Sequence, residues 1–133
     1  MGATPDGRKK GDYLSLSVSP SRLRAPDCIL DEIHSVRALN LAETGGINIL
    51  DINLPFNRHM MPETIGALVK AFMQTGGHAI EFNYVSRDEL VDATVHPEAH
   101  RDLIVRLYGL SEYFVNLGSD VQQEFITRNF CDA

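Results

Sequence analysis

The sequence has 133 residues, of which 44% are hydrophobic and 23% are charged, and its formal net charge is −6. This composition is typical of one globular domain and excludes an intrinsically disordered chain. The negative charge argues against a nucleic-acid-binding or anionic-membrane-binding surface, because both need clustered cations.

Two cysteines, Cys28 and Cys131, show no spacing typical of a metal site or a redox motif. They are therefore predicted to be free thiols in a reducing cytoplasm. No segment is apolar and long enough to predict a membrane-spanning helix, and the N-terminus lacks the apolar stretch of a signal peptide. We expect a cytoplasmic protein that contacts neither membrane nor nucleic acid.

The first third of the chain is predicted to be rich in turns. Turn-forming residues fill much of positions 1–26, and one alternating run at 13–18 predicts a short strand. Pro26 predicts the start of a helix that continues to about Leu39. The apolar, β-branched run at 47–54 predicts a buried strand.

The middle of the chain predicts a helix followed by a strand. Pro62 is expected to start the helix, and the glycine pair at 76–77 is expected to end it. The strand follows at 78–84. Within it, Glu81 and Asn83 are expected on the face opposite to the apolar side chains, because side chains alternate along a strand.

Shorter elements are predicted after this strand. The run at 86–89 is a capping box, which predicts a helix to about Thr94, and Pro97 predicts a single further helical turn. A short strand at 103–107 then runs directly into Tyr108 and Gly109.

The last predicted element is a helix, which a second capping pattern at 119–122 opens and which ends near Arg128. Helices and strands alternate along the chain, so the predicted fold class is α/β. The sequence contains no phosphate-binding loop, dinucleotide fingerprint, zinc-protease pair or nucleophile elbow. Motif rules alone therefore indicate only an α/β domain.

An ordered series of residues between positions 76 and 128 carries a more specific signal. The series is Gly76-Gly77, Ile80-Glu-Phe-Asn83, Leu90-x-Asp92-Ala93, His96-Pro97-Glu98, Asp102-Leu103, Val105-Arg106-x-x-Gly109, Ser111, Phe114, Leu117, Gln122 and Ile126-x-Arg128. It resembles the C-terminal domain of the glycyl radical enzymes, a family that includes pyruvate formate-lyase, the diol and choline lyases and related decarboxylases. Upstream, residues 4–8 and 15–21 resemble the segment that leads into the last strands of the family's barrel.

This resemblance implies a fold, a site and a cofactor requirement. Residues 56–133 would form the glycyl radical domain, and residues 1–55 the last strand and helix elements of a β/α barrel that a partner chain completes. Gly109 would be the catalytic residue that stores the radical. The chain itself would bind no cofactor or metal, because a separate activase with S-adenosylmethionine and an iron–sulfur cluster would install the radical.

Glycine suits this role for a physical reason. A radical on a backbone α-carbon flattens that carbon, and glycine has no Cβ to crowd it. We expect Phe114 and Leu117 to keep the loop around Gly109 dry and packed, because a long-lived radical requires the exclusion of water and oxidants. The plain alternative is that Gly109 is a turn glycine that needs a positive φ.

Three neighbours of Gly109 depart from the family's usual pattern. Leu107 stands where the family commonly has valine, and Leu110 stands where an aromatic residue is usual. Tyr108 occupies a position where small residues are commoner. These departures leave the substrate subfamily open.

The family's second site is a cysteine that receives the radical from the glycine, on a loop far upstream. Neither Cys28 nor Cys131 matches that loop, so both are interpreted as incidental thiols. The resemblance therefore implies a radical-storing subunit of a split anaerobic lyase, dehydratase or decarboxylase, or a spare radical domain. Its partners would be a larger subunit that carries the cysteine and the radical-activating enzyme. The alternative is a non-catalytic regulatory protein that occupies such an enzyme or its activase without carrying a radical.

Two further groups of polar residues are candidate sites. His96 and His100 have the spacing of one helix face, but a surface or capping role is favoured over metal binding. Asp51 and Asn53 alternate with apolar residues, which hints that they face a barrel interior and contact a substrate.

Overall fold

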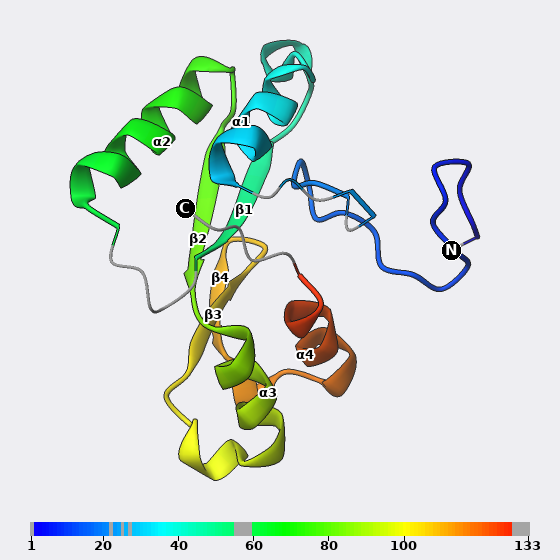
Figure 1. The fold of residues 1–133 in the computed structure, drawn as a ribbon, viewed down its shortest axis with the longest axis vertical. Coiled ribbons are helices and arrows are strands. Elements are labelled where there is room, and N and C mark those ends of the chain that lie inside the picture. The colour runs from blue at the N-terminus through cyan, green and yellow to red at the C-terminus, as the bar shows by residue number, and fades with distance from the viewer. Residues whose placement is uncertain (1, 22, 25, 27, 55–59, 129–133) are drawn as a thin grey trace.

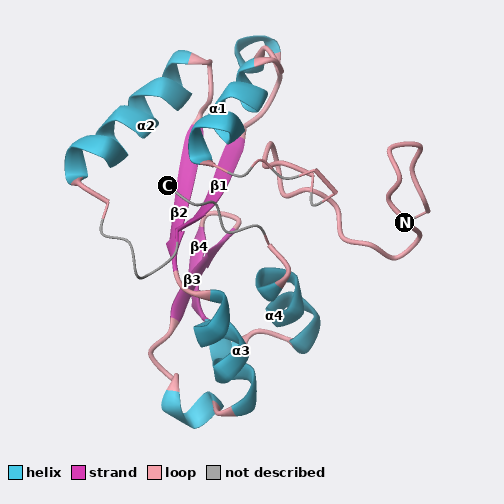
Figure 2. Cartoon of the chain, in the orientation of Figure 1, coloured by secondary structure: helices cyan, strands magenta, loops and turns pink. Residues whose placement is uncertain are grey.

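The computed structural model of the protein describes residues 2–21, 23, 24, 26, 28–54 and 60–128. Its helices and strands are α1 (Ile29–Arg37), β1 (Ile49–Leu54), α2 (Pro62–Gln74), β2 (Ala79–Tyr84), α3 (Arg87–Val95), β3 (Ile104–Leu107), β4 (Leu110–Tyr113) and α4 (Ser119–Ile126). They form two lobes (Figures 1 and 2): α1, α2, β1 and β2 make one, and α3, α4 and the β3–β4 hairpin make the other. The predicted α/β class is confirmed.

The first lobe is a strand–helix–strand unit. β1 and β2 pair in parallel, and α2 is the crossover helix that a parallel pair needs. The apolar face of β1, with Leu50 and Ile52, packs against Ile33 of α1 and Phe72 of α2 in one core. Leu68 of α2 joins the same core, because it lies one helical turn before Phe72.

The opposite face of this two-stranded sheet is polar. The register places Asp51 opposite Glu81 and Asn53 opposite Asn83, and all four side chains are buried. The predicted separation of polar and apolar faces in the 78–84 strand is thus confirmed. A buried polar face requires polar partners, and the second lobe supplies them.

The second lobe has its own core. Phe114 and Phe125 meet edge to face, with ring centroids 6.4 Å apart, and Leu90 and Val105 are fully buried beside them. The capping box before α3 is confirmed, because the Ser86 hydroxyl accepts a hydrogen bond from the Glu89 amide at 3.0 Å. The predicted single turn at Pro97 is also present.

Two local predictions were wrong, and one strand was missed. Residues 13–18 do not form a strand; Ser17 adopts a left-handed φ of 46°, which interrupts an extended chain. The capping pattern at 119–122 is not a cap, because Ser119 is already the first helical residue and Gly118 is the N-cap. Gln122 instead donates to the Phe114 carbonyl at 3.0 Å. β4 was not predicted.

The predicted boundary between residues 55 and 56 lies outside the described residues and stays a prediction. The first core draws on both sides of it, since α1 and β1 precede it and α2 follows it. Among the described residues, no helix combines the length and apolar character that crossing a bilayer requires.

Candidate functional site: the Gly109 hairpin

Gly109 occupies the turn of the β3–β4 hairpin. Leu107 pairs with Leu110, so Tyr108 and Gly109 form a two-residue loop. Their φ values are 52° and 83°, and positive values at both positions are the requirement of a type I′ turn. Glycine adopts such a φ freely, whereas for tyrosine it costs about 1–2 kcal/mol. The hairpin therefore stores backbone strain next to the candidate residue.

The turn is exposed in this chain. Tyr108 is 68% exposed and Leu110 is 72% exposed, and Gly109 between them is exposed as well. Phe114 is fully buried and Leu117 is partly buried, but both belong to the core of the second lobe and not to a shell around Gly109. The expectation of a dry, packed loop is therefore not met within the described residues.

Arg106 holds the turn from the strand that precedes it. Its Nη2 donates to the carbonyl oxygen of Gly109 at 3.2 Å, and its Nη1 donates to the Ser111 hydroxyl at 3.4 Å. The Nε atom of the same guanidinium lies 3.8 Å from Oε1 of Glu81. One side chain thus connects both strands of the hairpin to the polar face of β2.

Asn83 docks the hairpin onto β2. Its side-chain amide donates to the Arg106 carbonyl at 3.2 Å, and its Oδ1 accepts from the Arg106 amide at 2.6 Å. This pair of bonds satisfies a buried side chain and two backbone groups at once. A Cβ placed on Gly109 would lie 3.6 Å from Oε1 of Glu81, so the buried carboxylate is directly beneath the α-carbon.

A second ionic contact closes the polar face at its other end. Nη1 of Arg128 lies 3.5 Å from Oδ1 of Asp51, and its Nη2 lies 3.0 Å from Oε2 of Glu124. The guanidinium also covers the Phe125 ring at 3.8 Å. Burial raises the pKa of Asp51 to about 6; Arg128 opposes this rise, and Glu81 and Glu124 add to it.

The expected substrate contact by Asp51 and Asn53 is not available within the described residues. Both side chains line a cavity of about 30 Å³, together with Glu32 and Arg128. That volume has room for about one water molecule. Asp51 therefore serves the junction between the lobes in this structure, and not an open substrate site.

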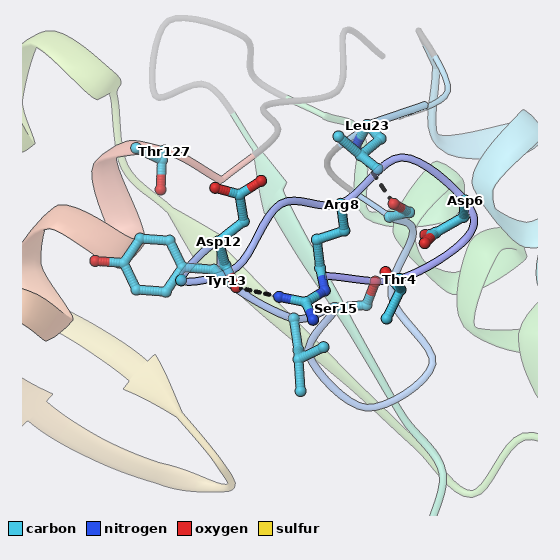
Figure 3. Close-up of a pocket in the computed structure, with 11 residues that line it drawn as sticks. Thr4, Asp6, Arg8, Asp12, Tyr13, Ser15, Leu23 and Thr127 are labelled. Atoms are coloured by element: carbon cyan, nitrogen blue, oxygen red, sulfur yellow. Dashed lines mark hydrogen bonds between the residues drawn. The ribbon is translucent and has the colours of Figure 1, made fainter. Parts of the chain in front are cut away.

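A larger pocket of about 530 Å³ lies at the N-terminal segment (Figure 3). The Arg8 side chain extends along this segment and donates to the carbonyl oxygens of Lys9, at 3.3 Å, and Asp12, at 2.8 Å. Tyr13 reaches α4 through a hydrogen bond from its hydroxyl to the Asp120 carbonyl, at 3.1 Å. Residues of the N-terminal segment, among them Thr4, Arg8 and Leu23, line the pocket together with Thr127, so its described lining lies outside the Gly109 hairpin.

The two histidines share one carboxylate. His96 and His100 are hydrogen-bonded to the two oxygens of Asp92 at 2.9 and 2.7 Å. The bond with His100 is the main cause of a lowered pKa of Asp92, and the bond with His96 adds to it. Among the described residues, no three His, Cys, Asp or Glu side chains are arranged to hold a metal ion. Cys28 is a half-buried free thiol at the N-cap of α1, and Cys131 lies outside the described residues.

A sequence model of the glycine radical family matches residues 15–115, a range that contains β1, β2 and the Gly109 turn. The chain belongs to the glycyl radical family. Membership implies a glycyl radical that is installed after translation.

Relatives of this glycyl radical protein are enzymes. Trans-4-hydroxy-L-proline dehydratase from Clostridioides difficile is 30% identical over 96% of this chain and 16% of its own length. Indoleacetate decarboxylase from Tractidigestivibacter scatoligenes is 30% identical over 99% of this chain and 15% of its length. The B12-independent glycerol dehydratase of Clostridium butyricum superposes with a TM-score of 0.89 at 28% identity, over 99% of this chain and 17% of that chain.

The chain thus spans about a sixth of the length of the relatives that it matches. The sequence identified Gly109 through the resemblance, but it gave no role to Arg106, Glu81 or Asn83. The sequence does contain a signal for such contacts, because a polar residue at every second position of a buried strand requires polar partners. Arg128 was noted only as the end of the motif series, although it carries the ion pair to Asp51.

Proposed function

We propose that this chain is the radical-storing component of a glycyl radical enzyme with lyase-type chemistry, and that Gly109 carries the radical. The observation that carries the proposal is the Gly109 turn, an exposed glycine inside the family's matched segment whose carbonyl accepts from an arginine. The absence of a Cβ at this position leaves room for an α-carbon that becomes planar. The exposure of the turn gives a radical-generating enzyme access to that carbon.

The proposed chemistry consists of two successive hydrogen-atom transfers. An activase that uses S-adenosylmethionine and an iron–sulfur cluster supplies a carbon radical, which takes a hydrogen atom from the α-carbon of Gly109. A carbon–hydrogen bond forms on the activase-derived group, and the unpaired electron stays on Gly109. A cysteine thiol then returns a hydrogen atom to Gly109, so that its own sulfur carries the electron and attacks the substrate.

The proposed partner is a larger polypeptide that supplies this cysteine and the remaining strands of the barrel. Two parallel strands cannot close a barrel, which supports the need for additional strands. The apolar side chains of Tyr108 and Leu110, exposed on either side of Gly109, support a covering surface over the turn. Dehydration or decarboxylation is the reaction class that the relatives suggest.

Cleavage by oxygen tests the radical position. The chain is incubated anaerobically with its partner and the activase, exposed to air, and analysed by intact mass. The proposal predicts oxygen-dependent cleavage of the chain at Gly109, no cleavage of Gly109→Ala, and normal cleavage of Gly66→Ala. Gly66 is the matched control because a Cβ there meets no atom within 4 Å. An intact chain after activation would instead support the non-catalytic regulatory alternative.

A further inference from the structure

Arg106 contacts the part of Gly109 over which an unpaired electron would be delocalised. An unpaired electron on a glycine α-carbon is shared with the adjacent carbonyl oxygen and amide nitrogen. In the charge-separated form of this arrangement, negative charge builds on the oxygen and positive charge on the nitrogen. The Gly109 oxygen is the atom that accepts from Nη2 of Arg106, at 3.2 Å.

An acidic side chain, Glu81, also lies close to Gly109. Oε1 of Glu81 would be 3.6 Å from a Cβ on Gly109, and the Glu81 side chain is only 5% exposed. Its Oε2 is buried without a hydrogen-bond partner. The burial of a carboxylate costs free energy unless a cation lies near it. Among the described residues, the Arg106 guanidinium lies beside Glu81, with Nε 3.8 Å from Oε1.

We propose that Arg106 stabilises the Gly109 radical through the carbonyl oxygen and that Glu81 is the positioning residue that holds Arg106 there. This inference rests on Gly109 as the radical site. The guanidinium provides a fixed positive charge where negative charge develops, and a preorganised charge needs no rearrangement when the radical forms. The Glu81 carboxylate holds the guanidinium in place through its contact with Nε of Arg106.

The arrangement of Arg106 favours this role over that of a simple hairpin clamp. Asn83 already fixes the Arg106 backbone with two hydrogen bonds, and the strand pairing fixes the turn. The guanidinium is therefore not needed to define the backbone position. A structural role alone would change the stability of the hairpin, whereas the proposed role changes the electronic properties of the radical.

Electron spin resonance of the activated complex separates the two roles. The variants are Arg106→Met, which removes the donor, Arg106→Lys, which keeps the charge, and Glu81→Gln, which removes the anion at nearly constant shape. Arg101→Met is the matched control, an exposed arginine of the same lobe. The measured quantities are the α-proton splitting of the glycine-centred doublet and the rate at which the radical decays under anaerobic conditions.

Loss of the cation should move spin density back to the α-carbon. We expect a larger α-proton splitting in Arg106→Met and a decay about fivefold faster, the effect of losing one modest hydrogen bond to a partly solvated group. Arg106→Lys and Glu81→Gln should give intermediate values, and Arg101→Met should match the wild type. The carbonyl carbon NMR resonance of Gly109 in the unactivated chain verifies that Arg106→Met has lost the contact and that Arg101→Met has kept it.

The outcomes distinguish this inference from the proposed function. A wild-type doublet whose splitting and decay are unchanged in all three site variants overturns the role of Arg106 and leaves Gly109 as the radical site. If Arg106→Met accepts no radical, wild-type values in both Arg106→Lys and Glu81→Gln overturn the inference. The absence of a doublet from the wild-type chain overturns the proposed function, and this inference with it.

Discussion

The buried carboxylate of Asp51 gives the chain a stability that depends on pH. Burial raises its pKa from 3.8 to about 6, so the folded state holds the proton more tightly than the unfolded state. The stabilising contribution is complete below about pH 4 and is lost as the pH rises through about 6. The full span, 6 minus 3.8 at 1.36 kcal/mol for each pH unit, is about 3 kcal/mol.

The Asp51→Asn substitution tests this reasoning, because asparagine resembles the protonated acid and does not titrate. Urea unfolding followed by circular dichroism gives the free energy of unfolding at about pH 4 and about pH 7.5. Between about pH 4 and about pH 7.5, the free energy of unfolding of the variant should increase by about 2 kcal/mol relative to that of the wild type. Asp31→Asn, at an exposed position of α1, is the control and should show no such growth. Parallel pH profiles for Asp51→Asn and the wild type would refute the reasoning.

Three further substitutions test the packing and the hairpin by the same unfolding measurement. Gly77→Ala should lower the free energy of unfolding by about 1–3 kcal/mol, because its Cβ would lie 2.3 Å from Cζ of Phe72; unchanged stability would contradict this contact. Tyr108→Asn should raise it by about 1 kcal/mol, since asparagine tolerates the left-handed φ of 52°; a loss of stability would show that the turn is not strained. Arg128→Met should lower it by about 3 kcal/mol, because the buried Asp51 and the partly buried Glu124 lose their cation; a change below about 1 kcal/mol would argue against the ion pairs.

Local signals were sufficient to predict most helices. The Pro62 start and the glycine end of α2, and the Ser86 cap of α3, act within a few residues of chain, so they can be read from the sequence. The two parallel strands were also predictable, because β1 lies in an apolar run and β2 is an alternating run after a glycine pair. Their polar face was visible as the alternation of Glu81 and Asn83 with apolar neighbours.

Elements that depend on distant partners could not be predicted in the same way. β4 is a short, exposed strand, and its register follows from a turn that contains a left-handed tyrosine, which turn rules do not anticipate. The 13–18 run alternates like a strand, but in the fold one backbone hydrogen bond, from the Val18 amide to the Ile49 carbonyl, ties it to β1. Alternation alone does not supply a strand partner.

The candidate site also has one part that the sequence predicts and another that only the tertiary structure reveals. Gly109 was predicted from an ordered motif series, whereas the contacts of Arg106 with Glu81 arise only when β2 and the hairpin meet in three dimensions. The Asp51–Arg128 pair joins residues 77 positions apart (128 minus 51) and was equally out of reach. Spacing along the chain predicts Gly109 as the radical site, and the tertiary structure adds the contacts of Arg106 and Arg128.

Electron spin resonance on chain labelled with glycine deuterated at the α-carbon tests the central claim most directly. After anaerobic activation with its partner, unlabelled wild-type chain should give a doublet, which collapses to a single line in the labelled chain. Gly109→Ala should give no such signal, and Gly66→Ala should keep it. A missing doublet, or one that persists in Gly109→Ala, would contradict the assignment of the radical to Gly109.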